Sequence, residues 1–89
     1  MNKYFNTMFT LISMLCYHNI PFNFKGSWRN QVTFPWCIGD VICIDDKFVE
    51  SYGFPWDEGD VSNKTPQDMF ILIKTYYKQV QQEIKKGGE

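Results

Sequence analysis

Bulky apolar residues recur every three or four positions near both ends of the chain, and this period predicts a helix at each end. The first helix is expected over 3–18. Asn19 is placed to end it, and Pro21 prevents its continuation. The predicted apolar face consists of Phe5, Met8, Phe9, Ile12, Leu15 and Cys16. The opposite face carries Lys3 as its only formal charge, so we expect a sheet, a second copy or a partner to cover part of it.

The second helix has the clearest start signal in the chain. Thr65 is a favourable N-cap, Pro66 occupies the favoured first helical position, and Asp68 completes an acidic capping box. Residues 85–89 are expected to fray as a tail. Ile71 projects from the polar face, where it would serve as an anchor if a partner binds. The predicted buried stripe is Met69, Ile73, Tyr76, Tyr77, Val80 and Ile84.

Between the helices the pattern changes to the alternation that is typical of strands. A hairpin is expected from 21–25 and 28–34, followed by a central strand over 36–45 with apolar residues on both faces. A turn over 45–47 then leads to an edge strand over 48–54. This order, α-β-β-β-(β)-α, predicts an α+β two-layer sandwich with a three- or four-stranded antiparallel sheet. The chain, 1–89, is expected to form a single domain that is stable alone or as a homodimer.

Charge is distributed unevenly along the chain. The segment 34–60 contains seven acidic residues and one lysine, a net charge of −6, whereas the whole chain has a net charge of −1. The same segment contains the tripeptide Phe-Pro-Trp twice, at 34–36 and 54–56. Trp36 and Trp56 are expected at strand ends, either packed at the core or its rim, or exposed as anchors for a partner.

Catalytic and metal-binding motifs are not recognisable. His18, the only histidine, has no neighbouring motif that would pair it with a thiol, and the acidic residues match neither a calcium loop nor a two-metal site. We therefore predict no enzymatic activity, no cofactor and no metal. Three cysteines, an odd number, favour a reducing, cytoplasmic location over a disulfide-stapled secreted domain. Neither a signal peptide nor a membrane span is expected.

The acidic residues have two main interpretations: a solvated turn, which is the more common role of such residues, or a protein-binding surface, which their clustering with Asp57, Glu58 and Asp60 supports. In that case the carboxylates supply charge and a tryptophan supplies an aromatic anchor. The alternative function is a small nucleic-acid-binding or regulatory module that uses Lys74, Lys78 and Lys85, although the sequence pI of about 5.7 counts against it. The predicted partner-binding residues are Asp45, Asp46, Glu50, Trp56, Asp57, Glu58 and Asp60.

Three short sequence motifs are followed by a capped helix. The motifs are Asn-Ile-Pro at 19–21, Gly-Asp-Val-Ile-Cys at 39–43 and Ser-Tyr-Gly at 51–53, and the helix begins at 65. This order resembles that of small accessory proteins of bacteriophages and prophages. The resemblance implies an anti-defence (anti-CRISPR-like) role, in which a non-enzymatic inhibitor binds a host defence nuclease in the bacterial cytoplasm. An acidic surface that imitates nucleic acid is physically consistent with that role.

Overall fold

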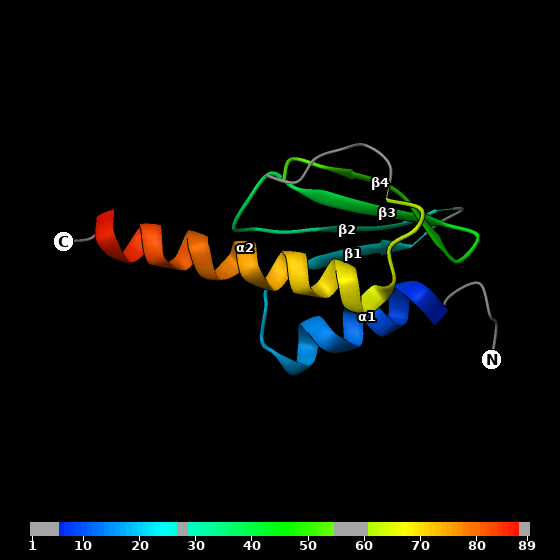
Figure 1. The fold of residues 1–89 in the computed structure, drawn as a ribbon, viewed down its shortest axis with the longest axis horizontal. Coiled ribbons are helices and arrows are strands. Elements are labelled where there is room, and N and C mark those ends of the chain that lie inside the picture. Colours follow the sequence, from blue (N-terminus) through cyan, green and yellow to red (C-terminus); the bar gives the residue numbers. More distant parts are fainter. Residues whose placement is uncertain (1–5, 27–28, 55–60, 88–89) are drawn as a thin grey trace.

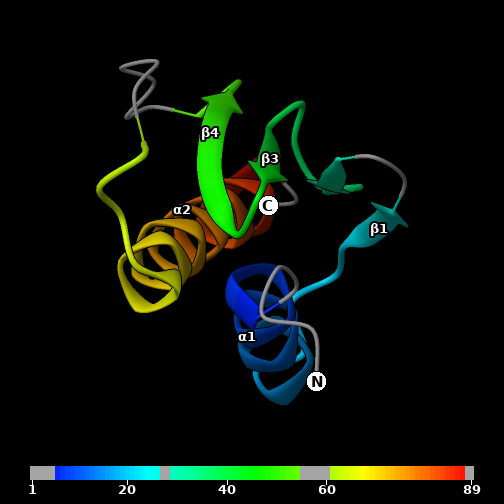
Figure 2. The ribbon, with the colours of Figure 1, turned by 90° about the vertical axis from the view of Figure 1, so that its right-hand side faces the viewer.

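The structure is a computed structural model that describes residues 6–26, 29–54 and 61–87. Its elements are α1 (Asn6–Tyr17), β1 (Asn23–Gly26), β2 (Asn30–Thr33), β3 (Asp40–Ile44), β4 (Lys47–Tyr52) and α2 (Pro66–Gly87). The strands form one antiparallel sheet in the order β1-β2-β3-β4, and both helices cover the same face of it (Figure 1, Figure 2). The predicted α+β sandwich is therefore confirmed, with the fourth strand at an edge.

The C-terminus of α1 is closed by a Schellman motif. Asn19 adopts a φ of 57°, a conformation that asparagine tolerates, and its N–H donates to the carbonyl of Cys16 at 3.1 Å. The N–H of Ile20 donates to the carbonyl of Leu15 at 3.0 Å, and both of these side chains are buried. The predicted end of the helix at Asn19 is confirmed.

The buried face of α1 differs from the predicted face. Met8, Leu11 and Leu15 are fully buried, whereas Phe9 and Cys16 are exposed. Apolar residues occur on most sides of this helix, so the sequence pattern is compatible with more than one buried face. Packing against α2 and the sheet determines that the side chains at positions 8, 11 and 15 are the buried ones. The prediction was correct for Met8 and Leu15, omitted Leu11 and was wrong about Phe9 and Cys16. Phe5 lies outside the described residues.

The central strand is shorter than predicted. β3 begins at Asp40, and Ile38, which was expected on this strand, is 91% exposed in the preceding turn. Trp36 turns toward α2 instead of continuing the strand: its indole N–H donates to the carbonyl of Pro21 at 2.9 Å, and its ring packs against those of Tyr76 and Tyr77. Within β3 itself, residues 41–43 are all buried, so the expectation of apolar residues on both faces is confirmed.

The two Phe-Pro-Trp sequences contribute to a single aromatic cluster. The ring centroids of Phe34 and Phe54 lie 5.8 Å apart, and Phe54 also contacts Tyr76 of α2. The Phe54 ring lies directly over Gly39, so a Cβ added to this glycine would come within 2.6 Å of a ring carbon. Trp36 packs in this cluster, as the core-or-rim interpretation proposed, whereas Pro55 and Trp56 lie outside the described residues.

A bulge in β4 allows Phe48 and Ser51 to face the core together. Strict alternation along a strand would place them on opposite faces of the sheet. Ile42 pairs with Glu50 and Cys43 pairs with Phe48, so Val49 is an extra residue between them. Phe48 and Ser51 are consequently both buried, although they are three positions apart.

The start of α2 matches the predicted capping box. The N–H of Asp68 donates to the hydroxyl of Thr65 at 3.1 Å, and the N–H of Thr65 donates to the Asp68 carboxylate at 3.2 Å. Met69 and Ile73 are fully buried as predicted, but Ile84 is 61% exposed. The helix extends through Gly87, past the position where the sequence suggested fraying.

Length explains the exposure of Ile84. The 22 residues of α2 span about 33 Å at ~1.5 Å per residue. The longest strand, β4, has six residues and spans only about 20 Å at ~3.3 Å per residue. The C-terminal part of α2 therefore extends beyond the sheet (Figure 1). No helix among the described residues is long and apolar enough to cross a membrane.

Candidate binding surfaces

The first candidate surface is the tip of the β3–β4 hairpin. Ile44 pairs with Lys47, so the loop between the strands has two residues, Asp45 and Asp46, with φ values of 51° and 65°. Two consecutive positive φ values define the type I′ turn that matches the twist of antiparallel strands, and aspartate tolerates this conformation better than most residues do. The predicted turn at this position is confirmed.

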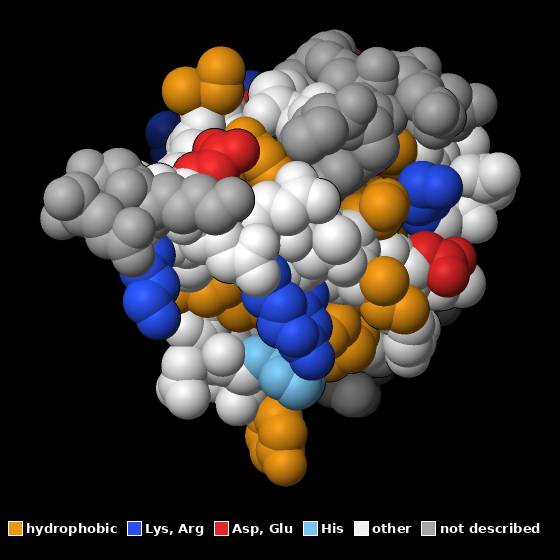
Figure 3. Space-filling model, turned by 60° about the vertical axis from the view of Figure 1, so that its left-hand side comes forward, with side chains coloured by type: hydrophobic (Ala, Val, Ile, Leu, Met, Phe, Trp, Pro, Cys, Tyr) orange, Lys and Arg blue, Asp and Glu red, His pale blue; other side chains and the backbone are white. Residues whose placement is uncertain are grey.

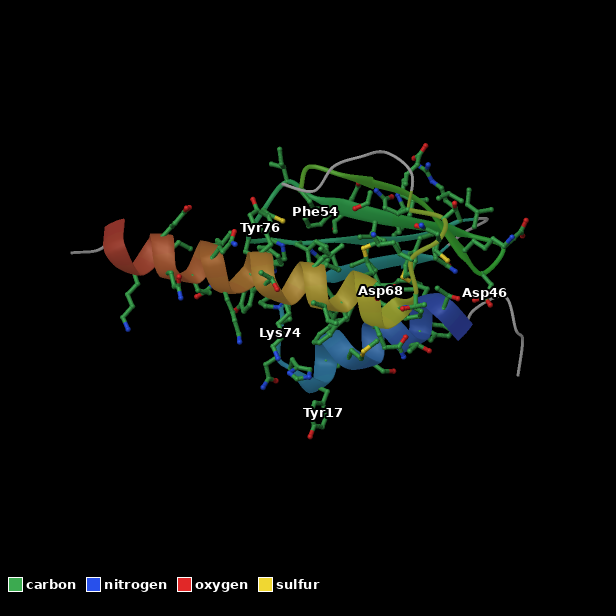
Figure 4. The ribbon with its side chains drawn as sticks, viewed as in Figure 1. Tyr17, Asp46, Phe54, Asp68, Lys74 and Tyr76 are labelled. Carbon is green, nitrogen blue, oxygen red and sulfur yellow. The ribbon has the colours of Figure 1, made fainter. Side chains whose placement is uncertain are left out.

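The second residue of this turn holds the start of α1. A carboxylate oxygen of Asp46 accepts the backbone N–H of Thr7 at 2.6 Å, and the Asp46 carbonyl accepts the Thr7 hydroxyl at 2.8 Å. Figure 4 shows Asp46 beside the start of α1. The first N–H groups of a helix lack intrahelical partners and carry partial positive charge, so a carboxylate there stabilises the helix. Asp46 thus acts as a cap supplied from 39 residues away in the sequence.

The remaining predicted site residues occupy different positions. Asp45 is exposed at the hairpin tip. Glu50 is half-buried and pairs with Ile42, which the alternation of β3 places on the face of the sheet opposite the helices. On the same face a carboxylate oxygen of Asp40 accepts a hydrogen bond from the Gln31 amide at 3.0 Å. The structure therefore brings Asp45, Asp46 and Glu50 onto one hairpin; Trp56, Asp57, Glu58 and Asp60 lie outside the described residues.

The second candidate surface lies where the C-terminus of α1 meets α2. The rings of Tyr17 and His18 make a T-shaped contact at a centroid distance of 5.2 Å, and His18 packs on Phe70 of α2 at 4.8 Å. The Lys74 ammonium group lies 5.9 Å from the centre of the Phe70 ring, within cation–π range. We call these four residues, together with Lys78, the helix-junction surface.

The aromatic part of this surface was not predicted from the sequence. Phe70 and Lys74 are one turn apart on the predicted helix, which is the spacing of facing side chains. Their meeting with Tyr17 and His18 requires the packing of α1 against α2, and no local pattern predicts that contact. Figure 3 shows the histidine beside lysine or arginine side chains, with a hydrophobic side chain projecting beyond it.

Burial makes two of the three thiols, those of Cys37 and Cys43, weaker nucleophiles at neutral pH. Burial, and to a smaller extent the charge of Asp46, raises the pKa of Cys43 from its ordinary value of 9.0 to about 11. Burial also raises the pKa of Cys37, partly offset by the Gly39 N–H that donates to its sulfur at 3.4 Å. A raised pKa lowers the thiolate population at neutral pH. Within the described residues, no group of three or more His, Cys, Asp or Glu side chains is placed to hold a metal ion.

Comparisons with protein-family models, with curated proteins and with solved structures find no match for this chain.

Proposed function

We propose that this chain is a non-catalytic binding protein that inserts the acidic β3–β4 hairpin into the nucleic-acid-binding channel of a partner protein. The observation that carries the proposal is that the two residues of the turn have different environments. Asp46 is fixed to the start of α1 by two hydrogen bonds, while Asp45 next to it is exposed to solvent. A carboxylate presented on a fixed turn loses little conformational freedom on binding.

The charge of the surrounding segment supports the same role. Residues 34–60 carry seven acidic side chains and one lysine, so the hairpin belongs to a segment with a net charge of −6. Such a charge steers association with a basic surface and can occupy the positions of nucleic-acid phosphates. The resemblance to phage accessory proteins suggests a host defence nuclease as the partner and the cytoplasm of the bacterial host as the location.

A capture experiment tests this proposal. Immobilised protein is incubated with a nuclease-treated lysate of a bacterial host, and bound proteins are challenged with increasing salt and with duplex DNA. We expect retention of a nucleic-acid-binding protein that both salt and DNA displace. Asp45→Asn should weaken retention, because asparagine keeps the turn conformation and removes the charge. Glu83→Gln is the matched control, since it removes one exposed charge from the far end of α2.

A second variant addresses the neighbouring acids outside the described residues. Asp57→Lys combined with Glu58→Lys should abolish retention while the circular dichroism spectrum and the melting temperature stay close to those of the wild type. Retention that is unchanged in this variant and in Asp45→Asn would contradict the proposal.

A further inference from the structure

We propose that the helix-junction surface binds single-stranded nucleic acid, with Tyr17 stacking on a base and Lys74 and Lys78 contacting phosphates. This site is separate from the acidic hairpin and goes beyond the function proposed above. The hairpin caps the first turn of α1, whereas the helix-junction surface is at the other end of the same helix (Figure 4).

The aromatic side of the site is exposed and supported from behind. Tyr17 is 82% exposed, although a tyrosine normally buries much of its ring. Its contact with His18, and the contact of His18 with the buried Phe70, link the exposed ring to the core. A ring held in this way offers a free surface to a stacking partner without a large loss of conformational freedom.

The cationic side of the site follows one stripe of α2. Lys74, Lys78 and Lys85 occupy positions i, i+4 and i+11, which fall on the same side of a helix. No acidic residue stands three or four positions from Lys74 or Lys78 in the sequence, so helical neighbours do not neutralise these two lysines. Lysines of this kind next to an exposed aromatic ring are the combination that single-strand binding proteins use.

This combination favours nucleic acid over an acidic protein partner. Carboxylates would satisfy the lysines but would leave the Tyr17 ring without a stacking partner, whereas a nucleotide supplies a phosphate and a flat base together. Stacking is also tolerant of base identity, so we expect little sequence preference.

Fluorescence anisotropy with a labelled oligothymidylate tests the site. Wild-type protein should bind at low salt, and Tyr17→Ala should weaken binding roughly five- to 150-fold, the range expected for loss of one stacked base. Tyr17→Phe should keep most of the affinity because it keeps the ring.

Lys74→Gln and Lys78→Gln should each reduce the slope of log affinity against log salt by about 0.7, the contribution of one phosphate contact to a single strand. Lys25→Gln, an exposed lysine on β1, is the matched control and should leave the slope unchanged.

An oligonucleotide with abasic positions separates stacking from charge. This oligonucleotide keeps the phosphates but lacks the bases, so its affinity for the wild type should equal that of thymidylate for Tyr17→Ala. Its affinity for Tyr17→Ala should be no lower still, because both changes remove the same stacking contact. Equal binding of abasic and thymidylate strands would overturn the proposal, as would the absence of binding at low salt. Displacement of the oligonucleotide by polyglutamate at the same charge concentration would also overturn it and would indicate an acidic protein as the ligand. Asp45→Asn reports on the hairpin alone, so a failure here is distinguishable from a failure of the proposed function.

Discussion

Asp45 and Asp46 show how neighbouring residues of the same type can have different roles. Both adopt positive φ in the same turn, but only Asp46 lies against the first turn of α1, where Thr7 donates to it twice. The sequence presents them as equal members of an acidic cluster. Their difference arises from a helix start that is distant in the sequence, so residue type and spacing alone cannot reveal it.

Alanine substitution at each position should separate the two roles. Both variants lose the aspartate that tolerates positive φ, so this conformational cost is common to them. Asp46→Ala also removes the cap of α1 and should therefore reduce the free energy of unfolding by about 1 kcal/mol more than Asp45→Ala does. Urea denaturation followed by circular dichroism measures the difference. Equal losses in the two variants would show that the hydrogen bond from the Thr7 N–H to the Asp46 carboxylate does not stabilise the fold.

Ser51 is a polar residue in an apolar position. Its side chain is fully buried, and its hydroxyl has no hydrogen-bond partner in the described structure. Ser51→Ala should consequently leave the free energy of unfolding unchanged or raise it by up to about 1 kcal/mol, because the cost of burying an unpaired hydroxyl disappears. Thr65→Ala is the comparison: its hydroxyl accepts the Asp68 N–H, so its loss should cost about 1 kcal/mol. A clear destabilisation by Ser51→Ala in urea titrations would mean that the hydroxyl is satisfied in solution.

At the scale of elements, the parts of the fold that local signals specify could be predicted, and those that depend on packing could not. The capping box at Thr65 and the end of α1 at Asn19 are determined by a few adjacent residues, and both are correct. The buried face of α1 depends on which neighbours it meets, and the β4 bulge at Val49 depends on pairing with β3. The aromatic part of the helix-junction surface escaped prediction for the same reason, although Lys74 and Lys78 had been named from the sequence.

The length of α2 relative to the sheet gives a prediction at this scale. Ile73 is fully buried, whereas Ile84 belongs to the same predicted stripe but is 61% exposed beyond the strands. Ile73→Ala should reduce the free energy of unfolding by roughly 2–5 kcal/mol, and Ile84→Ala by less than about 0.5 kcal/mol. Thermal or urea unfolding of the isolated protein measures both. A large loss for Ile84→Ala, increasing with protein concentration, would indicate that a second copy covers this end of the helix.

At the scale of the whole molecule, α1 separates two surfaces of opposite charge. Its 12 residues span about 18 Å, from the turn capped by Asp46 to Tyr17. The screening length is about 8 Å at 0.15 M salt and about 30 Å at 0.01 M, so charges at the two ends interact appreciably only at low salt. The two surfaces are therefore expected to bind their ligands independently under physiological conditions.

Measuring each ligand with variants of the other surface tests this independence. At 0.15 M salt, Asp45→Asn should change oligothymidylate affinity by less than about 1.5-fold, because screening removes the repulsion between the hairpin and the bound phosphates. The combined Lys74→Gln and Lys78→Gln variant should likewise leave salt-sensitive retention of the protein partner unchanged. At 0.01 M salt the weaker screening predicts a small gain in oligonucleotide affinity for Asp45→Asn. A gain of several-fold at 0.15 M would contradict independence, because it requires the Asp45 carboxylate to come within a few ångströms of the strand and thus to share one site with the lysines.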